Sequence, residues 1–573
     1  MSSTNPREER IPWPPVGVTA AIGSAAKSHR RALLFLIVIA CLAFLPGFFQ
    51  LPPIDREEAR LAQVTKQMIE TGDYLNIRFQ GEHRFRQPAG IHWLQAAVVT
   101  AGAGLGVSEA ETKIWLYRLP SLAGAMGAVL ITYWTALVFV SRRAALLSAL
   151  MVATSIALGA AARLATADAI WLFTVVAAMG ALARAYLGGG DRHRHLHGWA
   201  LPAIFWTALA AGLLIKGPLT LVYVVAAAAT VSVLDRSLHW LGALRSLWGL
   251  SWCLLLVGSY LLATWLHASD SASDRSLGED LLALVSGGRD SRFMPPGFYF
   301  VLFWVAFWPG ATLVGFAAPR LWAARHEPGA KFLLGWLIPA WLVLELLFAK
   351  HPQYMLPLFP AVAILLSGIL DPQLMSRKRW LVRGTSWWFV LPVVFSVAAV
   401  VAQIVIAKQL GLLAWPFAAG AVVLGLIAWR LYEVDGGERS LLRAMAASLL
   451  LSLACYGVVG PALQPLFPSV ALARIVRASE CKDPRAVSAG YHEPSLVFLV
   501  GTSTRYVDGA AAADFLARGP CRFAFVESRH ERNFAQRAEA IGLRYAPGPR
   551  IEGINYSAGR AVSIAVYVSE RVP

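Results

Sequence analysis

Long apolar runs separated by short polar segments occupy most of the first 465 residues. A run of about 20 apolar residues is long enough to cross a bilayer as a helix. The pattern therefore predicts an all-α polytopic membrane protein with about thirteen transmembrane helices. These helices are expected at residues 32–51, 119–140, 144–162, 169–187, 200–215, 217–234, 247–267, 298–318, 332–349, 354–370, 386–407, 412–430 and 443–462.

The composition excludes a water-soluble globular chain. Of 573 residues, 57% are hydrophobic and 15% are charged, so one soluble core cannot hold the apolar surface. The net charge of +17 does not require a nucleic-acid partner, because the basic residues gather in short loops, where they set membrane topology. The first run follows basic residues and lacks a small-residue cleavage site. It is predicted to be a retained helix.

The positive-inside rule predicts which loops face the cytoplasm. Residues 1–31 form a cytoplasmic tail, 32–465 form the transmembrane domain, and 52–118 and 268–297 form the large external loops. Every strongly basic loop then lies inside if the apolar segment 91–107 does not span, so that segment is predicted to be interfacial or re-entrant. The basic loop residues are Arg142, Arg143, Arg192, Arg194, Arg236, Arg245, Arg320, Arg325, Lys331, Arg377, Lys378, Arg379, Arg383, Arg430, Arg439 and Arg443.

The composition changes after about residue 466. Short alternating runs at 495–500, 522–527 and 561–568, separated by Gly, Pro and Asp, predict strands of a small α/β domain at 466–573, on the external side. Cys481 and Cys521 lie in this domain and are either free or joined in a disulfide. No Cys and His spacing resembles a zinc site.

A polar stretch, IDREEARLAQVTKQMIETGDYL, follows the first apolar run at residues 54–75. Its apolar residues recur at helical spacing, which predicts an amphipathic helix. One interpretation is a helix lying on the bilayer surface with acids in its first turn. The alternative is that the acids line a cavity and act on a substrate at the membrane surface. The charged residues concerned are Asp55, Glu57, Glu58 and Arg60.

The order of several motifs resembles a known family. After the first helix come an acidic pair, QMIETGD, an aromatic-x-x-Pro motif and GIHWLQ, followed by ARLATAD, GLLIKGPLTLV, PPGFYFVLFWVAFWPG and KHPQYMLPLFPAVAILL. This order is similar to that of the GT-C glycosyltransferases, which use polyprenyl-phosphate sugars. The branch resembled contains the aminoarabinose transferases that modify lipid A and relatives of the protein O-mannosyltransferases. The resemblance implies thirteen helices and a small external C-terminal domain.

The resemblance also implies site residues. The position of the family's first essential acid falls on Glu57, with Asp55 as the alternative, and the second acid matches Asp168, which could instead cap its helix. The neighbouring Glu58 and Arg60 are assigned to substrate binding. The family's phosphate-binding lysine is Gln87 here, so Arg84 and Arg86 are expected to supply the positive charge.

In this chemistry the sugar leaves a lipid phosphate, so cations must stabilise phosphate while carboxylates orient or deprotonate the acceptor. A single displacement predicts inversion at the anomeric carbon. Neither a metal nor another cofactor is required. The further phosphate candidates are Arg289, Arg292, Lys350 and Tyr354, although Arg289 and Arg292 could instead anchor their loop to anionic lipid.

The expected protein is a glycosyltransferase of the bacterial inner membrane whose active site faces the periplasm. Its partners would be a polyprenyl-phosphate sugar, a lipid or glycan acceptor such as lipid A, and membrane lipids. A transporter or flippase of a lipid-linked saccharide is the alternative, which would need charge near the bilayer midplane, where Glu345 is the main candidate. A non-catalytic scaffold would leave the acids of 54–75 unexplained.

Overall fold

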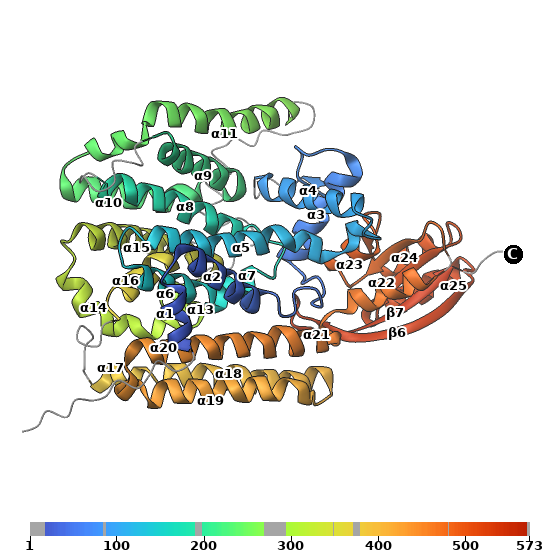
Figure 1. Cartoon of the computed structure of the whole chain (residues 1–573). Helices are drawn as coiled ribbons and strands as arrows, with labels where there is room; N and C mark the ends of the chain where they lie inside the picture. The colour runs from blue at the N-terminus through green and yellow to red at the C-terminus, as the bar shows by residue number, and fades with distance from the viewer. Residues whose placement is uncertain are drawn as a thin grey trace, which may run out of the picture.

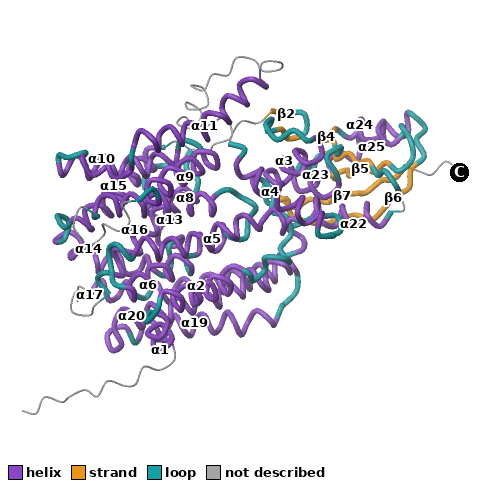
Figure 2. Tube along the Cα trace, turned by 45° about the horizontal axis from the view of Figure 1, so that its top comes forward, coloured by secondary structure: helices purple, strands orange, loops and turns teal. Residues whose placement is uncertain are grey.

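The computed structural model describes residues 18–83, 88–188, 198–268, 294–347, 349–370, 379–479 and 481–569. A bundle of helices makes up most of it, and the larger of its two sheets forms a compact unit at one end of the bundle (Figures 1 and 2). The helices α3 (Glu57–Thr71) and α4 (Gly90–Gly104) lie at that same end, beside the C-terminal unit. The fold is therefore a helical membrane region joined to a small domain that contains a sheet.

The bundle is built from apolar helices of unequal length. By length and composition, seven described helices can cross a membrane, or eight if one bent pair counts as a single span. The bundle helices are α1 (Val18–Ala25), α2 (His29–Phe44), α5 (Ile114–Ala136), α6 (Arg142–Ala153), α7 (Ile156–Ala161), α8 (Asp168–Leu187), α9 (Ala200–Lys216), α10 (Leu219–Asp235), α11 (Ser246–Ala268), α13 (Phe298–Ala306), α14 (Val314–Ala323), α15 (Pro328–Leu346), α16 (Phe359–Ser367), α17 (Arg379–Gly384), α18 (Trp387–Ala402), α19 (Trp415–Arg430), α20 (Tyr432–Ser452) and α21 (Gly460–Ala462).

Several expected spans are interrupted. The first expected span forms α2, which ends at Phe44 instead of continuing to residue 51, because Pro46 follows and Gly47 adopts a positive φ. The run 144–162 is divided between α6 and α7, and the run 298–318 bends by 110° between α13 and α14. Apolar composition fixes that a segment is buried in membrane or protein, but not that its helix is continuous.

The polar stretch after the first span forms the predicted helix, α3. It ends at Gly72, and the hairpin strands β1 (Arg78–Phe79) and β2 (Glu82–His83) follow. α3 is packed between α4 and the C-terminal domain rather than lying free on a surface. α4 in turn packs closely on α9, because a Cβ at Gly90 would lie 2.5 Å from the carbonyl oxygen of Leu214.

The C-terminal domain has a five-stranded mixed sheet in the order β4-β3-β5-β7-β6. Strands β3, β4 and β5 are parallel, and the long β6–β7 hairpin is antiparallel. The predicted α/β class is confirmed. The elements are β3 (Arg485–Ala489), β4 (Arg505–Val507), β5 (Arg522–Glu527), β6 (Tyr545–Asn555) and β7 (Arg560–Ser569), with α22 (Pro468–Ala478), α23 (Pro494–Val500), α24 (Gly509–Leu516) and α25 (Ser528–Ala540).

One predicted strand is wrong. Residues 495–500 form helix α23, whereas 522–527 and 561–568 do form strands β5 and β7. Pro494 starts α23 at a position where its missing N–H is not needed, and the apolar residues pack against α3 and the sheet. A short, uniformly apolar run has no periodicity that separates helix from strand.

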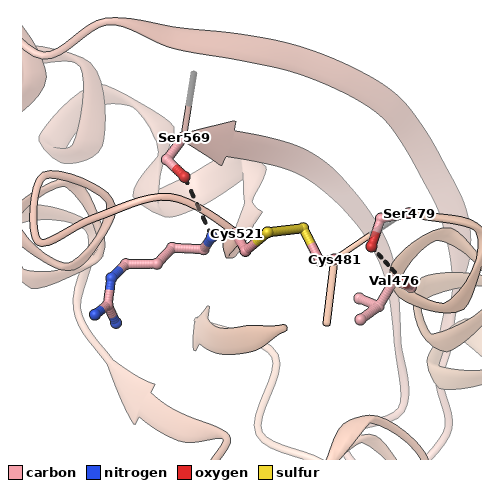
Figure 3. The surroundings of a disulfide bond; sticks show 6 residues. Val476, Ser479, Cys481, Cys521 and Ser569 are labelled. Atoms are coloured by element: carbon pink, nitrogen blue, oxygen red, sulfur yellow. Dashed lines mark hydrogen bonds between the residues drawn. A yellow bond between two sulfur atoms is a disulfide. The ribbon is translucent and has the colours of Figure 1, made fainter. Parts of the chain in front are cut away.

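Cys481 and Cys521 are joined in a disulfide, which decides the alternative that their sequence positions left open (Figure 3). The bridge ties the segment that follows α22 to the start of β5. Beside it, the N–H of Arg522 donates to the Oγ atom of Ser569, at the end of β7 (Figure 3). The disulfide therefore fastens the entry of the domain to the middle of its sheet.

Candidate active site

Glu57 begins α3 and is half-exposed. Its carboxylate accepts a hydrogen bond from Nε2 of Gln353 at 3.2 Å and lies 3.7 Å from Nδ1 of His351. Both partners belong to the KHPQY segment between α15 and α16. The first-loop acid and this segment, which are far apart in the sequence, are therefore neighbours in the structure.

Asp168 is the first residue of α8 and is buried. Its Oδ1 atom lies 2.7 Å from Nζ of Lys216, which is the last residue of α9 and is buried too. The carboxylate thus pairs with a cation of another helix, and the residue at the N-cap position is Ala167. Gly217 makes the tight turn after Lys216 with φ near 72°, a conformation that favours glycine.

The aromatic ring of Tyr354 joins these two acidic positions. The ring centroid lies 5.7 Å from Nζ of Lys216 and 5.1 Å from the ring of His351. Lys216 and Tyr354 each interact electrostatically with both Asp168 and Glu57. Two acids, a lysine, a tyrosine and a histidine, contributed by α3, α8, α9 and the KHPQY segment, therefore gather in one place.

Asp55 contacts the C-terminal domain, whereas Glu57 contacts the KHPQY segment. Asp55 is buried, and its Oδ1 atom accepts a hydrogen bond of 2.9 Å from the backbone N–H of Ser495, near the start of α23. Burial, together with the negative charge of Glu493, raises the pKa of Asp55 from its usual 3.8 to about 7. Asp55 therefore lies in the contact between the first loop and the C-terminal domain.

Glu58 and Arg60 also have protein neighbours. Both carboxylate oxygens of Glu58 accept hydrogen bonds from Arg118, in a buried ion pair with an Nε–Oε1 distance of 2.7 Å. Arg60 interacts electrostatically with Glu493 and Tyr506 of the C-terminal domain. Although they are close together in the sequence, Asp55, Glu57, Glu58 and Arg60 thus divide among three neighbourhoods.

Lys350, the first residue of the KHPQY segment, is buried. Its ammonium group donates to the backbone oxygens of Met294 and Leu347, at 3.0 and 2.8 Å. These contacts hold a cation at the end of the bundle where α13 begins. The other cations predicted for phosphate, Arg84, Arg86, Arg289 and Arg292, lie outside the described residues.

Two further predictions concern metals and transport. Within the described ranges, no group of three or more His, Cys, Asp or Glu side chains is arranged to hold a metal ion. Glu345, the acid considered for a transporter, lies in the last turn of α15 and accepts hydrogen bonds from the backbone N–H groups of Gly297 and Phe300. Its carboxylate therefore holds the start of α13.

Sequence reasoning named neither Lys216 nor His351 and Gln353 as individual site residues. Each had a signal: Lys216 is a lone lysine at the end of an apolar run, and the other two stand inside a recognised motif. Arg118 was overlooked as well. A basic residue at the end of an apolar run is usually a topology marker, so its pairing shows only in the fold.

Comparison with known proteins supports the motif resemblance. Residues 97–267 match the family model "Dolichyl-phosphate-mannose-protein mannosyltransferase". An undecaprenyl phosphate-alpha-4-amino-4-deoxy-L-arabinose arabinosyl transferase of Pseudomonas paraeruginosa is 27% identical over 367 residues. The protein of the same name from Edwardsiella ictaluri is 26% identical over 355 residues. The aligned part covers 62% of this chain and 63% of the Pseudomonas protein, and 59% of each chain for Edwardsiella.

The fold extends the likeness to almost the whole chain. The crystal structure of ArnT from Cupriavidus metallidurans bound to undecaprenyl phosphate matches with a TM-score of 0.69, covering 93% of this chain and 97% of ArnT at 16% identity. Its apo form gives a TM-score of 0.70. The chain is thus a multi-pass membrane protein with the GT-C glycosyltransferase fold. Within that class it resembles the aminoarabinose transferase branch.

Proposed function

We propose that this protein is an integral membrane glycosyltransferase that moves a sugar from a polyprenyl-phosphate donor to lipid A or a similar envelope acceptor. The observation that carries the proposal is the meeting of Glu57 and Asp168 around Lys216 and Tyr354 at one end of the bundle. The named relatives use an undecaprenyl-phosphate sugar, and the related crystal structure binds undecaprenyl phosphate. A charged cluster beside apolar helices suits a substrate with a polar head and a lipid tail.

Glu57 is the better candidate for the residue that contacts the acceptor. It is half-exposed, whereas Asp55 is buried against the C-terminal domain. A hydroxyl acceptor would give its proton to this carboxylate, and a phosphate acceptor would only be oriented by it. Asp168, paired with Lys216, fixes a lysine beside the ring of Tyr354.

The leaving group is a lipid phosphate, which gains negative charge as the sugar departs. Lys350 and Lys216 supply positive charge at the same end of the bundle, and Arg84, Arg86, Arg289 and Arg292 remain predicted contributors. Fixed cations in a site that excludes water stabilise such charge strongly. Attack on the anomeric carbon opposite the phosphate inverts its configuration.

We propose the periplasmic face of the bacterial inner membrane as the location of this site. The loops 52–118, 163–168, 216–218 and 349–354 then share a side with the C-terminal domain. The basic loops lie on the other side, as the positive-inside rule requires for thirteen spans. The disulfide of the C-terminal domain suits an oxidising compartment.

The test is lipid analysis of a strain that lacks the gene. Mass spectrometry of its lipid A should show the loss of one sugar, restored by the wild-type gene and not by Glu57→Gln or Asp168→Asn, each of which should lower transfer about 100-fold or more. Glu438→Gln is the matched control, since Glu438 pairs with Arg143 in a predicted cytoplasmic region. Full restoration by both site variants would refute the mechanism.

A transporter would behave differently in the purified system. Protein in lipid nanodiscs, supplied with the undecaprenyl-phosphate sugar and lipid A, has no second compartment to transport into. Appearance of the glycosylated acceptor therefore reports transfer alone. A protein that moves the lipid-linked sugar across vesicles without producing this product would be a flippase.

A further inference from the structure

Glu58 and Arg118 form a closed hydrogen-bond network between the two segments that carry Glu57 and Asp168. Oε1 of Glu58 accepts from Nε of Arg118 at 2.7 Å and from the backbone N–H of Ala165 at 2.8 Å. Oε2 accepts from Nη2 of Arg118 and from the backbone N–H of Ile54, both at 2.9 Å. One buried carboxylate thus links the segment before α3 to the segment before α8.

All five N–H donors of Arg118 are used. Besides the two bonds to Glu58, Nη1 donates to the carbonyl oxygens of Phe48 and Leu51, and Nη2 donates to that of Pro52. A lysine has three donors on one point and cannot reproduce this fork. The guanidinium therefore fixes the chain from the end of the first span to the start of α3.

The carbonyl groups of Ala165 and Thr166 are fixed as well. Nε2 of Gln95 in α4 donates to the carbonyl oxygen of Ala165 at 3.1 Å, and Oγ of Ser121 donates to that of Thr166 at 2.7 Å. Oε1 of Gln95 accepts from Oγ1 of Thr65 in α3. The loop that leads into Asp168 is thus held by side chains of α3, α4 and α5.

From this geometry we infer that Glu58 and Arg118 are positioning residues that set the placement of Glu57 relative to Asp168. The inference rests on the proposed function for its catalytic meaning. Glu57 directly precedes Glu58, and Asp168 follows Ala165 by less than one helical turn. A displacement of about 1 Å between reacting groups lowers a rate about 100-fold, so this network controls the catalytic rate rather than substrate binding.

The first test measures the network without activity. The variant Glu58→Gln places an amide beside backbone N–H donors and removes the charge that faces Arg118. Hydrogen–deuterium exchange of the full-length protein in nanodiscs should then rise at least about threefold in both 54–59 and 163–168. The control Arg184→Gln removes a partly buried arginine at the far end of α8, and should leave both segments unchanged. Unchanged exchange at 163–168 in Glu58→Gln would overturn the inference, whether or not the protein transfers sugar.

The second test uses a double-mutant cycle on transfer. Glu58→Gln should lower kcat about 10- to 100-fold with KM for the donor changed less than about threefold, but should lower the residual rate of Asp168→Asn less than about threefold. Coupling of this kind is expected only for residues that act through one another. Arg184→Gln should lower both rates by the same factor. Equal losses from Glu58→Gln in both backgrounds would refute positioning, and a wild-type protein without transfer would refute the proposed function while the exchange result stands.

Discussion

The Nζ atom of Lys216 and the Oδ1 atom of Asp168 are 2.7 Å apart, and both side chains are buried. Removing one member of a buried ion pair leaves an uncompensated charge and typically costs about 3–5 kcal/mol, whereas a neutral pair costs far less. We therefore expect Lys216→Met to destabilise the protein more than the double variant Lys216→Met/Asp168→Asn. Thermal unfolding in detergent measures this difference, and both variants should lack transfer. Equal stability of the two would show that the pair is not desolvated.

We expect Asp55 to make the docking of the C-terminal domain depend on pH. Because its pKa is raised to about 7 in the folded protein, the folded state binds more protons than the unfolded chain between about pH 4 and 7. The stability of this contact is therefore full at low pH and is lost as pH rises through 7. Burial also raises the pKa of Glu493, while Arg56 and Arg60 oppose that shift.

The measurement is hydrogen exchange of residues 491–500 at pH values from 5 to 8, corrected for the intrinsic exchange rate. Protection should fall across this range in the wild type. Asp55→Asn, which mimics the protonated acid, should keep its protection at pH 8. The control is Asp483→Asn, an exposed acid of the same domain, which should follow the wild type. A wild-type profile that is flat between pH 5 and 8 would contradict the prediction.

Lys350 is predicted to contribute to donor binding. A hydrogen bond to a charged group contributes about 1.5–3 kcal/mol, so Lys350→Gln should raise KM for the undecaprenyl-phosphate donor about 10- to 100-fold. Initial rates at varied donor concentration measure this. Lys331→Gln is the matched control, because Lys331 pairs with Asp235 at the junction of α10 and α15. An unchanged KM in Lys350→Gln would remove Lys350 from the donor site.

Reduction of the disulfide should loosen the C-terminal domain. The bridge joins residues separated by 40 positions, and closing a loop of that length stabilises a fold by about 2–4 kcal/mol. Cys481→Ser/Cys521→Ser should therefore make the domain more sensitive to limited proteolysis. Transfer at low temperature should be retained, since the bridge joins β5 to the segment after α22, and neither carries a candidate site residue. Loss of transfer with unchanged protease resistance would contradict this account.

Sequence reasoning predicted the elements that have a strong local pattern. The spacing of Leu61, Val64, Met68 and Ile69 predicts α3 correctly, since one apolar face is a local property. The prediction of a strand at 495–500 is wrong because the conformation of this run depends on Pro494 and on packing against α3. The breaks near residues 154 and 307 are missed when hydrophobicity alone defines a span, although Thr154–Ser155 and Pro309–Gly310 stand at them.

The sequence predicted two acids of the candidate site and Tyr354, but not Lys216, His351 and Gln353. Motif order identified Glu57 and Asp168, yet the neighbours Lys216 and His351 depend on helix packing. The sequence leaves open whether Asp55 or Glu57 is the first essential acid, because the two residues are only two positions apart. The hydrogen bond between Asp55 and Ser495 favours Glu57, because it engages Asp55 with the C-terminal domain. These two residues are 440 positions apart, and no local pattern encodes such a contact.

The C-terminal domain contacts α3 through buried polar groups. Nε2 of Gln63 donates to Oγ1 of Thr502, and Nζ of Lys66 donates to the carbonyl oxygen of Phe498. Severing the chain after the last span would leave these side chains, and Asp55, without the groups that now satisfy them. We therefore expect the two parts to unfold together, and a membrane region expressed alone would contain an α3 that lacks these buried polar contacts.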